Sequence, residues 1–343
     1  MKPLVSILIP AHNAEKWIAD TIRSAVAQSW ERKEIIVIDD GSTDQTMGIA
    51  RQFESESVRV VSQKNQGAAA ARNKAFSLSH GDYIQWLDAD DLLASDKIAR
   101  QMEVLSLCRS RRTLLSSSWG TFMYRPNRAR FTPTALWWDL SPTEFLVRRL
   151  GQKAWMQTAT WLVSRELTEA AGPWNTRMLS DDDGEYFCRV VVASDGIRFV
   201  PEARVYYRFV GPRSLGYVGR SDRKLEALWH SMQLHISYVR SLEDSERVRA
   251  ACLSYLQKCM AHFYPLRLDI VEQMHKVAKD LGGQLDPPRL SWKYSWIRVL
   301  FGWRGARRTQ LFLPSVKWSL MCFWDKAVFR IERRGVARTN LGV

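Results

Sequence analysis

The chain has no run of about 18 apolar residues, the length at which a segment is interpreted as a membrane-spanning helix, so none is expected. A single Lys precedes the first apolar residues, and this start does not resemble a secretory signal peptide. The five cysteines are odd in number and include no C-x-x-C pair. This pattern argues against a disulfide framework or a zinc cage and favours a reducing, cytoplasmic setting.

Two glycine-rich patterns that bind phosphate are also absent. Neither G-x-G-x-x-G nor G-x-x-x-x-G-K-[ST] occurs in the chain. The dinucleotide-dependent oxidoreductases and the P-loop enzymes therefore lack their main sequence signal here. An enzyme of either class is not expected.

The charge of the chain is high and unevenly distributed. The 343 residues carry a formal net charge of +14, which suggests an anionic partner such as nucleic acid, a phosphate-bearing substrate or a membrane surface. Residues 289–343 hold twelve Lys and Arg but only Asp325 and Glu332 as acids. The rest of the chain is close to balanced, and its 46% hydrophobic content is that of an ordinary globular protein.

The first 90 residues alternate between short apolar runs and amphipathic segments at intervals of about 25 residues. This alternation predicts a mostly parallel α/β sheet flanked by helices. The expected strands are Leu4–Ile9, Glu34–Ile38, Val58–Val61 and Tyr83–Leu87. The expected helices run from a cap at Asn13 to near Ser29, from Gln45 to Glu54 and from Ala68 to Leu78.

Polar side chains follow the ends of these strands, which is where open α/β sheets bind ligands. They are His12 and Asn13, Asp39 and Asp40, Gln66, Gly67 and Arg72, and Asp88, Asp90 and Asp91. A helix N-terminus suits an anionic group, and crowded carboxylates suit a hard divalent cation. The pattern therefore predicts a site for a nucleotide diphosphate with a metal ion.

The next part of the chain is less regular. We expect strands at Leu114–Tyr124, Trp155–Ser164, Ile197–Val200 and Ala203–Arg208, and helices at Pro142–Arg149, capped by Ser141, and Arg165–Ala171. A second acidic cluster, Asp181 to Asp183, opens a further apolar segment with helical character. Acidic residues at such a position either complement the helix dipole or carry chemistry, and the cluster alone does not distinguish these readings.

From Ser221 the pattern becomes helical, and a domain division of 1–220, 221–285 and 286–343 is expected. His230, His235 and His262 lie among apolar helix positions and are interpreted as ordinary helix residues rather than metal ligands. The basic, Trp-rich tail has three interpretations: an interfacial segment on anionic lipid, a helical tail packed on the catalytic domain, or a binder of single-stranded nucleic acid.

Four motifs in this order resemble the family 2 glycosyltransferases of GT-A fold. They are VSILIPAHN at 5–13, IVIDDGSTD at 36–44, NQGAAAARN at 65–73 and WLDADD at 86–91. The resemblance extends over about residues 3–215 and does not include the helical tail. It implies inverting transfer of a sugar from a nucleotide diphosphate, expected to be a UDP-sugar, to a hydroxyl of a glycan or glycolipid.

The resemblance also implies roles for particular residues. Asp39 or Asp40 would bind the base of the nucleotide, Asp88 and Asp90 would hold Mg²⁺ or Mn²⁺, and Asp183 would be the catalytic base, with Asp182 as the alternative. Asp182-Asp183 followed by Arg189 fits the spacing of the family's Glu-Asp pair and its Arg, although the first residue departs from Glu. The nucleotide-binding residues implied are Pro10, Asn13, Asp39, Asp40, Gln66, Gly67, Arg72, Asp88 and Ala89.

Further expectations concern two arginines, the location of the protein and the alternative functions. Arg208 and Arg213 follow the last strands and are candidates for clamping phosphate. The expected location is cytoplasmic, with peripheral contact at the inner face of the membrane through the tail. A metal-dependent nucleotidyltransferase acting on sugar phosphates is the enzymatic alternative, but the Gly-rich basic N-terminal loop expected of it is missing. The third alternative is a non-catalytic basic binding module, which would not account for the carboxylates at the strand ends.

Overall fold

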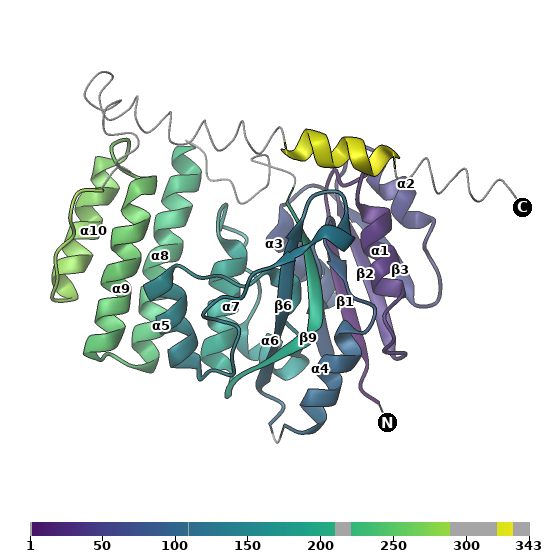
Figure 1. Cartoon of the computed structure of the whole chain (residues 1–343), viewed down its shortest axis with the longest axis horizontal. Coiled ribbons are helices and arrows are strands. Elements are labelled where there is room, and N and C mark those ends of the chain that lie inside the picture. Colours follow the sequence, from purple (N-terminus) through teal and green to yellow (C-terminus); the bar gives the residue numbers. More distant parts are fainter. Residues whose placement is uncertain (1, 109, 210–220, 289–320, 332–343) are drawn as a thin grey trace, which may run out of the picture.

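The computed structural model of the chain describes residues 2–108, 110–209, 221–288 and 321–331 (Figure 1). Arg213 and most of the basic tail lie outside these residues. The described residues form a sheet-containing part, next to a block of long helices.

Four parallel strands make the centre of the molecule, as predicted. They are β1 (Val5–Ala11), β2 (Lys33–Asp40), β3 (Val58–Gln63) and β4 (Tyr83–Trp86), and a short antiparallel strand, β8 (Val163–Ser164), completes the order β3-β2-β1-β4-β8. Alternate side chains of β1 enter different cores, which is why its apolar run is continuous. Ile7 and Ile9 face one core, and Leu8 faces the other.

Helices cover both faces of this sheet. The first core includes α1 (Ile18–Val26) and α4 (Lys97–Ser106), and the second includes α3 (Ala68–Ser77); α2 (Thr46–Arg51) follows β2. The helix positions agree with expectation, but Asn13 does not cap α1. Asn13 has a φ of 49°, and its side chain accepts a hydrogen bond from the Thr43 backbone N–H at 2.8 Å.

A second sheet of order β5-β9-β6-β7 contains β5 (Leu92–Leu93), β6 (Thr113–Phe122), β7 (Arg130–Phe131) and β9 (Gly196–Arg208). The two strands expected between 197 and 208 are therefore one strand, which absorbs an irregularity opposite Ser117 and Ser118. The strand expected at Trp155–Ser164 is wrong for most of its length. Its middle is a 3₁₀ turn, Thr158–Thr160, Leu162 forms an isolated bridge with Leu115 of β6, and β8 pairs with β4.

The helices between β7 and β9 have the expected start signals. Ser141 accepts a hydrogen bond from the Glu144 N–H at 3.2 Å and begins α5 (Pro142–Gln152). Helix α6 spans Arg165–Ala171, as expected, and ends at Gly172, whose φ is 76°. Helix α7 (Asp182–Ala193) begins directly after Asp181.

Three long helices, α8 (Asp222–Leu242), α9 (Glu246–Cys259) and α10 (Leu268–Asp280), form the block beside α5 and α7 in Figure 1. Their apolar side chains belong to the same core as Leu8 and Trp86, so the hydrophobic core is continuous across the boundary expected near residue 220. Among the described residues, no helix combines the length and hydropathy needed to cross a bilayer.

One piece of the tail, residues 321–331, is a helix that lies across the sheet-containing part (Figure 1). Asp325 accepts hydrogen bonds from the Tyr124 N–H at 3.0 Å and the Arg125 Nε at 2.8 Å. Phe329 packs against the Tyr124 ring, with centroids 6.0 Å apart. For this piece, the contacts fit the expectation of a tail packed on the catalytic domain.

Candidate active site

Three aspartates follow β4, but they lie in different environments. Asp91 is fully buried, and its two carboxylate oxygens accept hydrogen bonds from the Arg208 N–H at 2.7 Å and from the Gln157 side chain. Burial and the neighbouring Asp90 raise the pKa of Asp91 well above its usual range. Asp91 therefore stabilises the loop and has no oxygen left for a ligand.

Asp88 and Asp90 remain more accessible and fit a divalent cation. Asp88 uses Oδ1 to accept from Arg72 Nη2 at 2.7 Å, and its side chain is 30% exposed. Asp90 is half-buried, and burial together with the Asp88 charge raises its pKa to about 6. A hard cation between them would relieve this repulsion. Among the described residues there is no cluster of three His, Cys, Asp or Glu that could hold a metal ion by itself.

Arg208, the candidate phosphate clamp, contacts the loop that carries Asp90. Its side chain is buried, and its Nε donates to the Asp90 carbonyl oxygen at 2.8 Å. Its guanidinium lies 4.2 Å from the centre of the Trp17 ring. These contacts stabilise the loop that carries Asp90. The guanidinium charge interacts with a backbone carbonyl oxygen and an aromatic ring inside the protein.

Asp39 and Asp40, at the end of β2, differ in whether both carboxylate oxygens have partners within the protein. Asp40 Oδ1 accepts from the Gln66 N–H at 2.9 Å, and Oδ2 accepts from the Gly67 N–H at 2.8 Å, so its carboxylate fastens the start of α3 to β2. Asp39 keeps one buried oxygen, Oδ1, without a partner among the described residues. A buried oxygen without a donor is costly, and this makes Asp39 the one of the two with capacity for a ligand.

The other expected nucleotide residues surround the same edge of the sheet. Pro10 pairs with Ile38 near the ends of β1 and β2, and Asn13 lies just beyond β1. The Ala89 carbonyl accepts from Thr21 Oγ at 2.9 Å, which ties the loop after β4 to α1. The topology therefore brings these residues to one edge, together with Gln66 and Gly67.

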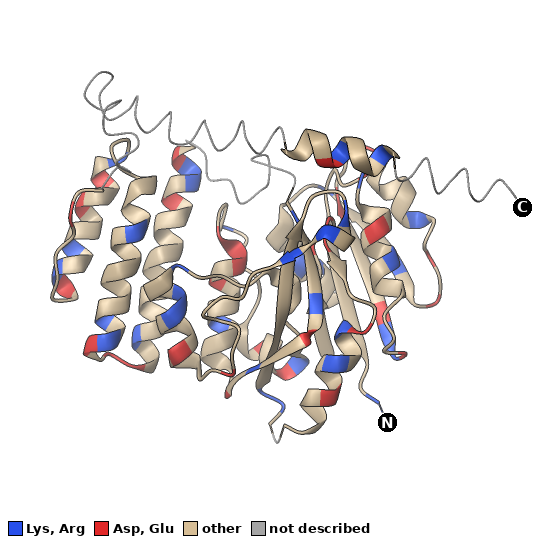
Figure 2. Cartoon of the chain, viewed as in Figure 1, with Lys and Arg blue, Asp and Glu red and all other residues tan. Residues whose placement is uncertain are grey.

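The second acidic cluster begins α7, coloured red at the upper end of that helix in Figure 2. Asp182 pairs with Arg72, with Oδ2 2.8 Å from Nη1. Asp181 instead accepts from Ser231 of α8 at 2.6 Å. Asp183 has neither partner and lies on the wall of a cavity of about 140 Å³, with Trp155, Met156 and other residues.

Asp183 has the properties of a proton acceptor. Burial, followed by the charges of Asp182 and Asp181, raises its pKa to about 7 despite the opposing effect of Arg72. A carboxylate with a pKa near neutrality accepts a proton more readily than an ordinary aspartate and is still substantially ionised at pH 7. The cavity beside it gives a second molecule access to that carboxylate.

Arg72 connects the two acidic groups. Its two terminal nitrogens bind Asp88 and Asp182, and its guanidinium stacks on Trp174, 4.3 Å from the ring centre. Trp174 in turn stacks on Tyr186 of α7 at 3.9 Å and meets Trp86 of β4 edge-on at 5.3 Å. The end of β4 and the start of α7 are thus held together by both an ionic bridge and an aromatic cluster.

Several residues of this site carry no sequence signal that identifies them. Trp174 is fixed by Asn73, which donates to its carbonyl at 2.9 Å and accepts from its N–H at 2.8 Å. Ser231 and Arg149 reach Asp181 from α8 and α5. These contacts join residues far apart in the chain, and a single sequence shows no trace of them.

Comparison with known proteins agrees with this geometry. The crystal structure of S. aureus TarS 1-349 in complex with UDP-GlcNAc is similar over 81% of this chain and 80% of that one, with a TM-score of 0.65 and 17% sequence identity. That likeness concerns the fold, which is the GT-A fold of glycosyltransferases. Residues 6–168 match the family model described as Glycosyl transferase family 2. These residues therefore form a family 2 glycosyltransferase region, as the motifs predict.

Two Escherichia coli proteins illustrate the relatives. The UDP-Glc:alpha-D-GlcNAc-diphosphoundecaprenol beta-1,3-glucosyltransferase WfaP is 40% identical over 105 residues, 30% of this chain and 41% of that protein. Chondroitin synthase is 44% identical over 98 residues, 28% of this chain and 14% of that protein. The match thus spans less than half the length of these curated relatives. The family match supports the predicted glycosyltransferase and not the nucleotidyltransferase alternative.

Replacing Arg72 by Met tests whether the bridge holds the two acidic groups together. The variant leaves Asp88 and Asp182 without their shared cation, and we expect the free energy of unfolding in urea to fall by about 3 kcal/mol. Arg23→Met is the matched control, because Arg23 is exposed and forms its ion pair with Asp20 at 3.0 Å near the surface, so a loss under about 1 kcal/mol is expected. Equal losses in the two variants would contradict the bridging role.

Proposed function

We propose that the chain transfers a sugar from a nucleotide-diphosphate donor to an acceptor hydroxyl, with inversion at the sugar carbon, and that Asp183 is the catalytic base. The observation that carries the proposal is the position of Asp183. Its carboxylate has a pKa raised to about 7 and lines a cavity, while its neighbour Asp182 is bound to Arg72. Of the carboxylates at the start of α7, Asp183 is thus the one free to receive a proton.

The chemistry needs such a group because a hydroxyl is a poor nucleophile at neutral pH. As the acceptor oxygen forms its bond to the sugar carbon, Asp183 takes the hydroxyl proton, and the bond to the leaving diphosphate breaks on the opposite side of the carbon. General base assistance of this kind contributes about 10²–10⁴-fold in rate. Direct displacement by the acceptor, without a covalent intermediate on the protein, inverts the configuration.

The donor side of the proposal rests on a different set of residues. Asp39, with its unpartnered oxygen, binds the nucleotide base, and the edge formed by Pro10, Asn13 and Ala89 surrounds it. Asp88 and Asp90 hold Mg²⁺ or Mn²⁺, which neutralises charge on the leaving diphosphate when bound. We propose a UDP-sugar as donor, because a chain of similar fold, TarS, was crystallised with UDP-GlcNAc.

The acceptor is proposed to be a glycan or a glycolipid. WfaP, by its name, acts on a sugar linked to diphosphoundecaprenol, and chondroitin synthase makes a polysaccharide. The cavity next to Asp183 agrees with this class, because Trp155 and Phe145 line it and aromatic faces bind the apolar faces of sugar rings.

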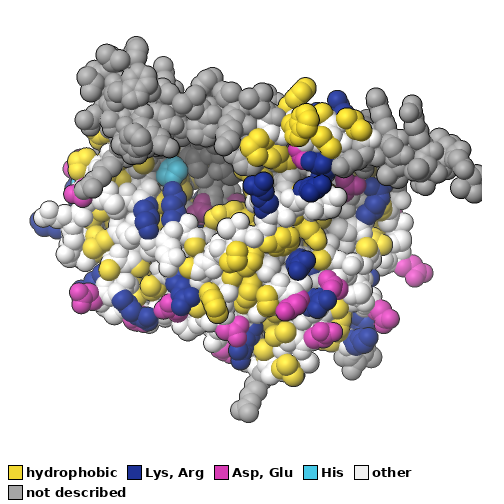
Figure 3. Space-filling model, in the orientation of Figure 1, with side chains coloured by type: hydrophobic (Ala, Val, Ile, Leu, Met, Phe, Trp, Pro, Cys, Tyr) yellow, Lys and Arg dark blue, Asp and Glu magenta, His cyan; other side chains and the backbone are white. Residues whose placement is uncertain are grey.

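We also propose peripheral contact with an anionic membrane surface. The helix 321–331 turns one face toward Tyr124 and leaves Phe323 and Trp324 74% and 69% exposed, next to Ile331. Figure 3 shows these hydrophobic side chains gathered on one outer surface with Lys and Arg side chains beneath them. An exposed apolar face flanked by cations is typical of a helix that lies in a lipid interface.

A screen of sugar nucleotides tests the reaction. Each donor is incubated with the full chain, a glycan or glycolipid acceptor and Mg²⁺ or Mn²⁺, and released nucleoside diphosphate is measured. We expect release with at least one UDP-sugar, and loss of release when EDTA is added, since without a cation the Asp88 and Asp90 carboxylates repel the diphosphate. Release of pyrophosphate from a nucleoside triphosphate and a sugar phosphate would support the nucleotidyltransferase instead.

Asp183→Asn tests the base. We expect turnover to fall by about 10²–10⁴-fold while donor binding, measured by calorimetry, is retained, because the amide cannot take the proton. Asp182→Asn is the matched comparison. It keeps an acceptor oxygen for Arg72 and should lose less turnover than Asp183→Asn. If Asp182→Asn shows the larger loss, the base is Asp182.

Phe323→Ser with Trp324→Ser tests the membrane contact. We expect the double variant to sediment with vesicles containing phosphatidylglycerol about tenfold less than the wild type, since two large apolar side chains lose their burial in lipid. Leu107→Ser is the control, because Leu107 is a highly exposed apolar residue on α4's end rather than on this helix. Equal sedimentation of all three proteins would exclude this helix as the contact.

A further inference from the structure

Asp181, the residue that precedes α7, is held in an unusual conformation by the helical block. Its φ is 58°, in the left-handed region that costs free energy for a residue with a side chain. Its Oδ2 accepts a hydrogen bond from Ser231 Oγ of α8 at 2.6 Å, and its Oδ1 lies 3.8 Å from Arg149 Nη2 of α5. Contacts from two other helices therefore compensate for the backbone strain.

The carboxylate of Asp181 also folds back over the first turn of its own helix. A Cβ atom at Gly184 would lie 2.1 Å from Asp181 Oδ1 and 2.5 Å from Arg149 Nη2. Only a glycine at position 184 leaves room for this arrangement. The Asp181 carboxylate thus lies directly against the helical turn that carries Asp183.

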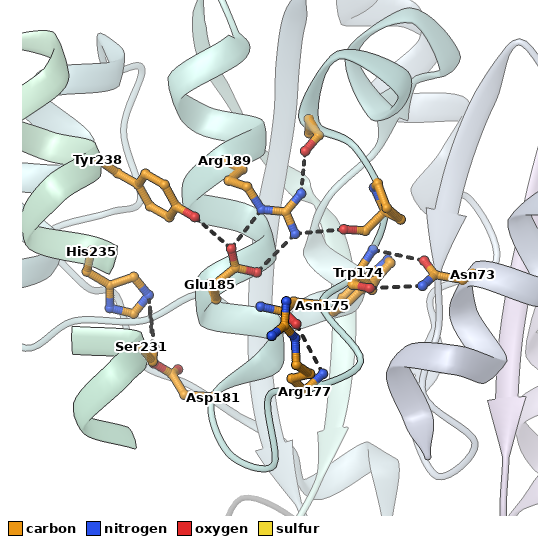
Figure 4. Close-up of polar contacts among 12 residues, drawn as sticks. Asn73, Trp174, Asn175, Arg177, Asp181, Glu185, Arg189, Ser231, His235 and Tyr238 are labelled. Atoms are coloured by element: carbon orange, nitrogen blue, oxygen red, sulfur yellow. Dashed lines mark hydrogen bonds and ion pairs between the residues drawn. The ribbon is translucent and has the colours of Figure 1, made fainter. Parts of the chain in front are cut away.

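The hydrogen bonds continue into the helical block, as Figure 4 shows for Ser231 and His235. Ser231 Oγ lies 3.4 Å from His235 Nε2, and His235 Nδ1 lies 3.1 Å from the Tyr255 hydroxyl of α9. Since Ser231 donates to Asp181, its oxygen accepts from Nε2–H, and Nδ1 accepts from the tyrosine hydroxyl. Each of these buried polar groups then has a partner.

A second connection joins α8 to the next turn of α7 (Figure 4). The Tyr238 hydroxyl donates to Glu185 Oε1 at 2.8 Å, and Glu185 also pairs with Arg189 Nε at 2.7 Å. Arg189 donates to the carbonyl oxygens of Ala171 and Pro173. Helix α8 therefore holds α7 and the loop before Trp174, on which Arg72 stacks.

We propose that Ser231 and His235 of α8 are positioning residues for the sugar transfer, which place the Asp183 carboxylate by holding Asp181 at the start of α7. The inference rests on the proposed role of Asp183 as the base. In this arrangement the two residues that precede the base are both anchored: Asp182 is tied to Arg72 of α3, and Asp181 is tied to α8. The helical block is then part of the catalytic apparatus.

Two attachments are needed because the catalytic carboxylate has to be placed precisely. The first residues of a helix lack the full set of backbone hydrogen bonds and fray easily. A displacement of about 1 Å of a catalytic group can cost about 10²-fold in rate. Arg72 fixes the turn at Asp182, and the hydrogen bond from Ser231 fixes it at a second point, Asp181.

Ser231→Ala in the full chain is the first test, read by hydrogen–deuterium exchange of the amides of residues 182–187 and by turnover. We expect faster exchange in this turn, turnover reduced about tenfold to 10²-fold and donor affinity unchanged. Ser241→Ala is the matched control, because Ser241 on the same helix is exposed and bonds only its own helix at the Tyr238 carbonyl. Unchanged exchange, or faster exchange with wild-type turnover, would overturn the proposal.

Two substitutions of Asp181 separate placement from charge. Asp181→Asn keeps an acceptor for Ser231, whereas Asp181→Ala removes it, so positioning predicts much greater turnover in the Asn variant. Equal losses would show that the charge near Asp183 matters instead and would overturn the proposal. If the wild type uses no sugar nucleotide, the proposed function fails, and the exchange of residues 182–187 in Ser231→Ala and Asp181→Asn still decides whether the anchor exists.

Discussion

The bridge formed by Arg72 is the interaction on which the site depends. One guanidinium binds Asp88, after β4, and Asp182, at the start of α7, and so places two segments far apart in the chain next to each other. The planar fork of arginine presents two terminal nitrogens in fixed directions, which a lysine cannot do. Because Arg72 is buried and stacked on Trp174, the geometry of this bridge follows from the packing of the aromatic cluster around it.

Around that bridge, the carboxylates divide into those that hold the structure and those left for chemistry. Asp40 fastens α3, Asp91 fastens the loop after β4, and Asp181 fastens α7 to α8. Both oxygens of Asp40 and Asp91 accept hydrogen bonds from the protein, and Asp181 accepts one from Ser231 and pairs with Arg149. Asp39, Asp90 and Asp183 lie one or two residues away along the chain and retain capacity for a ligand, a cation or a proton.

The helical block is linked structurally to the central sheet and to α7. It shares a hydrophobic core with one face of the central sheet, and its polar contacts reach the first two turns of α7. A continuous core makes rigid-body movement of the block costly, because any shift would break close packing on both sides. The orientation of α7 is therefore determined jointly by the sheet and by α8.

Much of this could be predicted from the sequence by itself. The apolar runs and their spacing determine the parallel sheet, and the turn residues place Asp39, Asp88 and Asp183 at ends of strands or helices, because hydrophobic period and capping are local properties. Where local signals were weak, prediction failed: Trp155–Ser164 forms a turn stabilised by the Gln157 side chain rather than a long strand. The role of Arg208 as a phosphate clamp stays a prediction, and in the structure its side chain contacts the loop that carries Asp90.

Which aspartate keeps a free oxygen, and which is consumed by the fold, was decided only by the tertiary structure. Adjacent residues such as Asp182 and Asp183 are chemically identical in the sequence, and they differ because Arg72 reaches one and a cavity adjoins the other. The sequence determined where carboxylates are available. The folded chain determined their partners, since burial and the direction of a side chain depend on contacts with residues distant in the sequence.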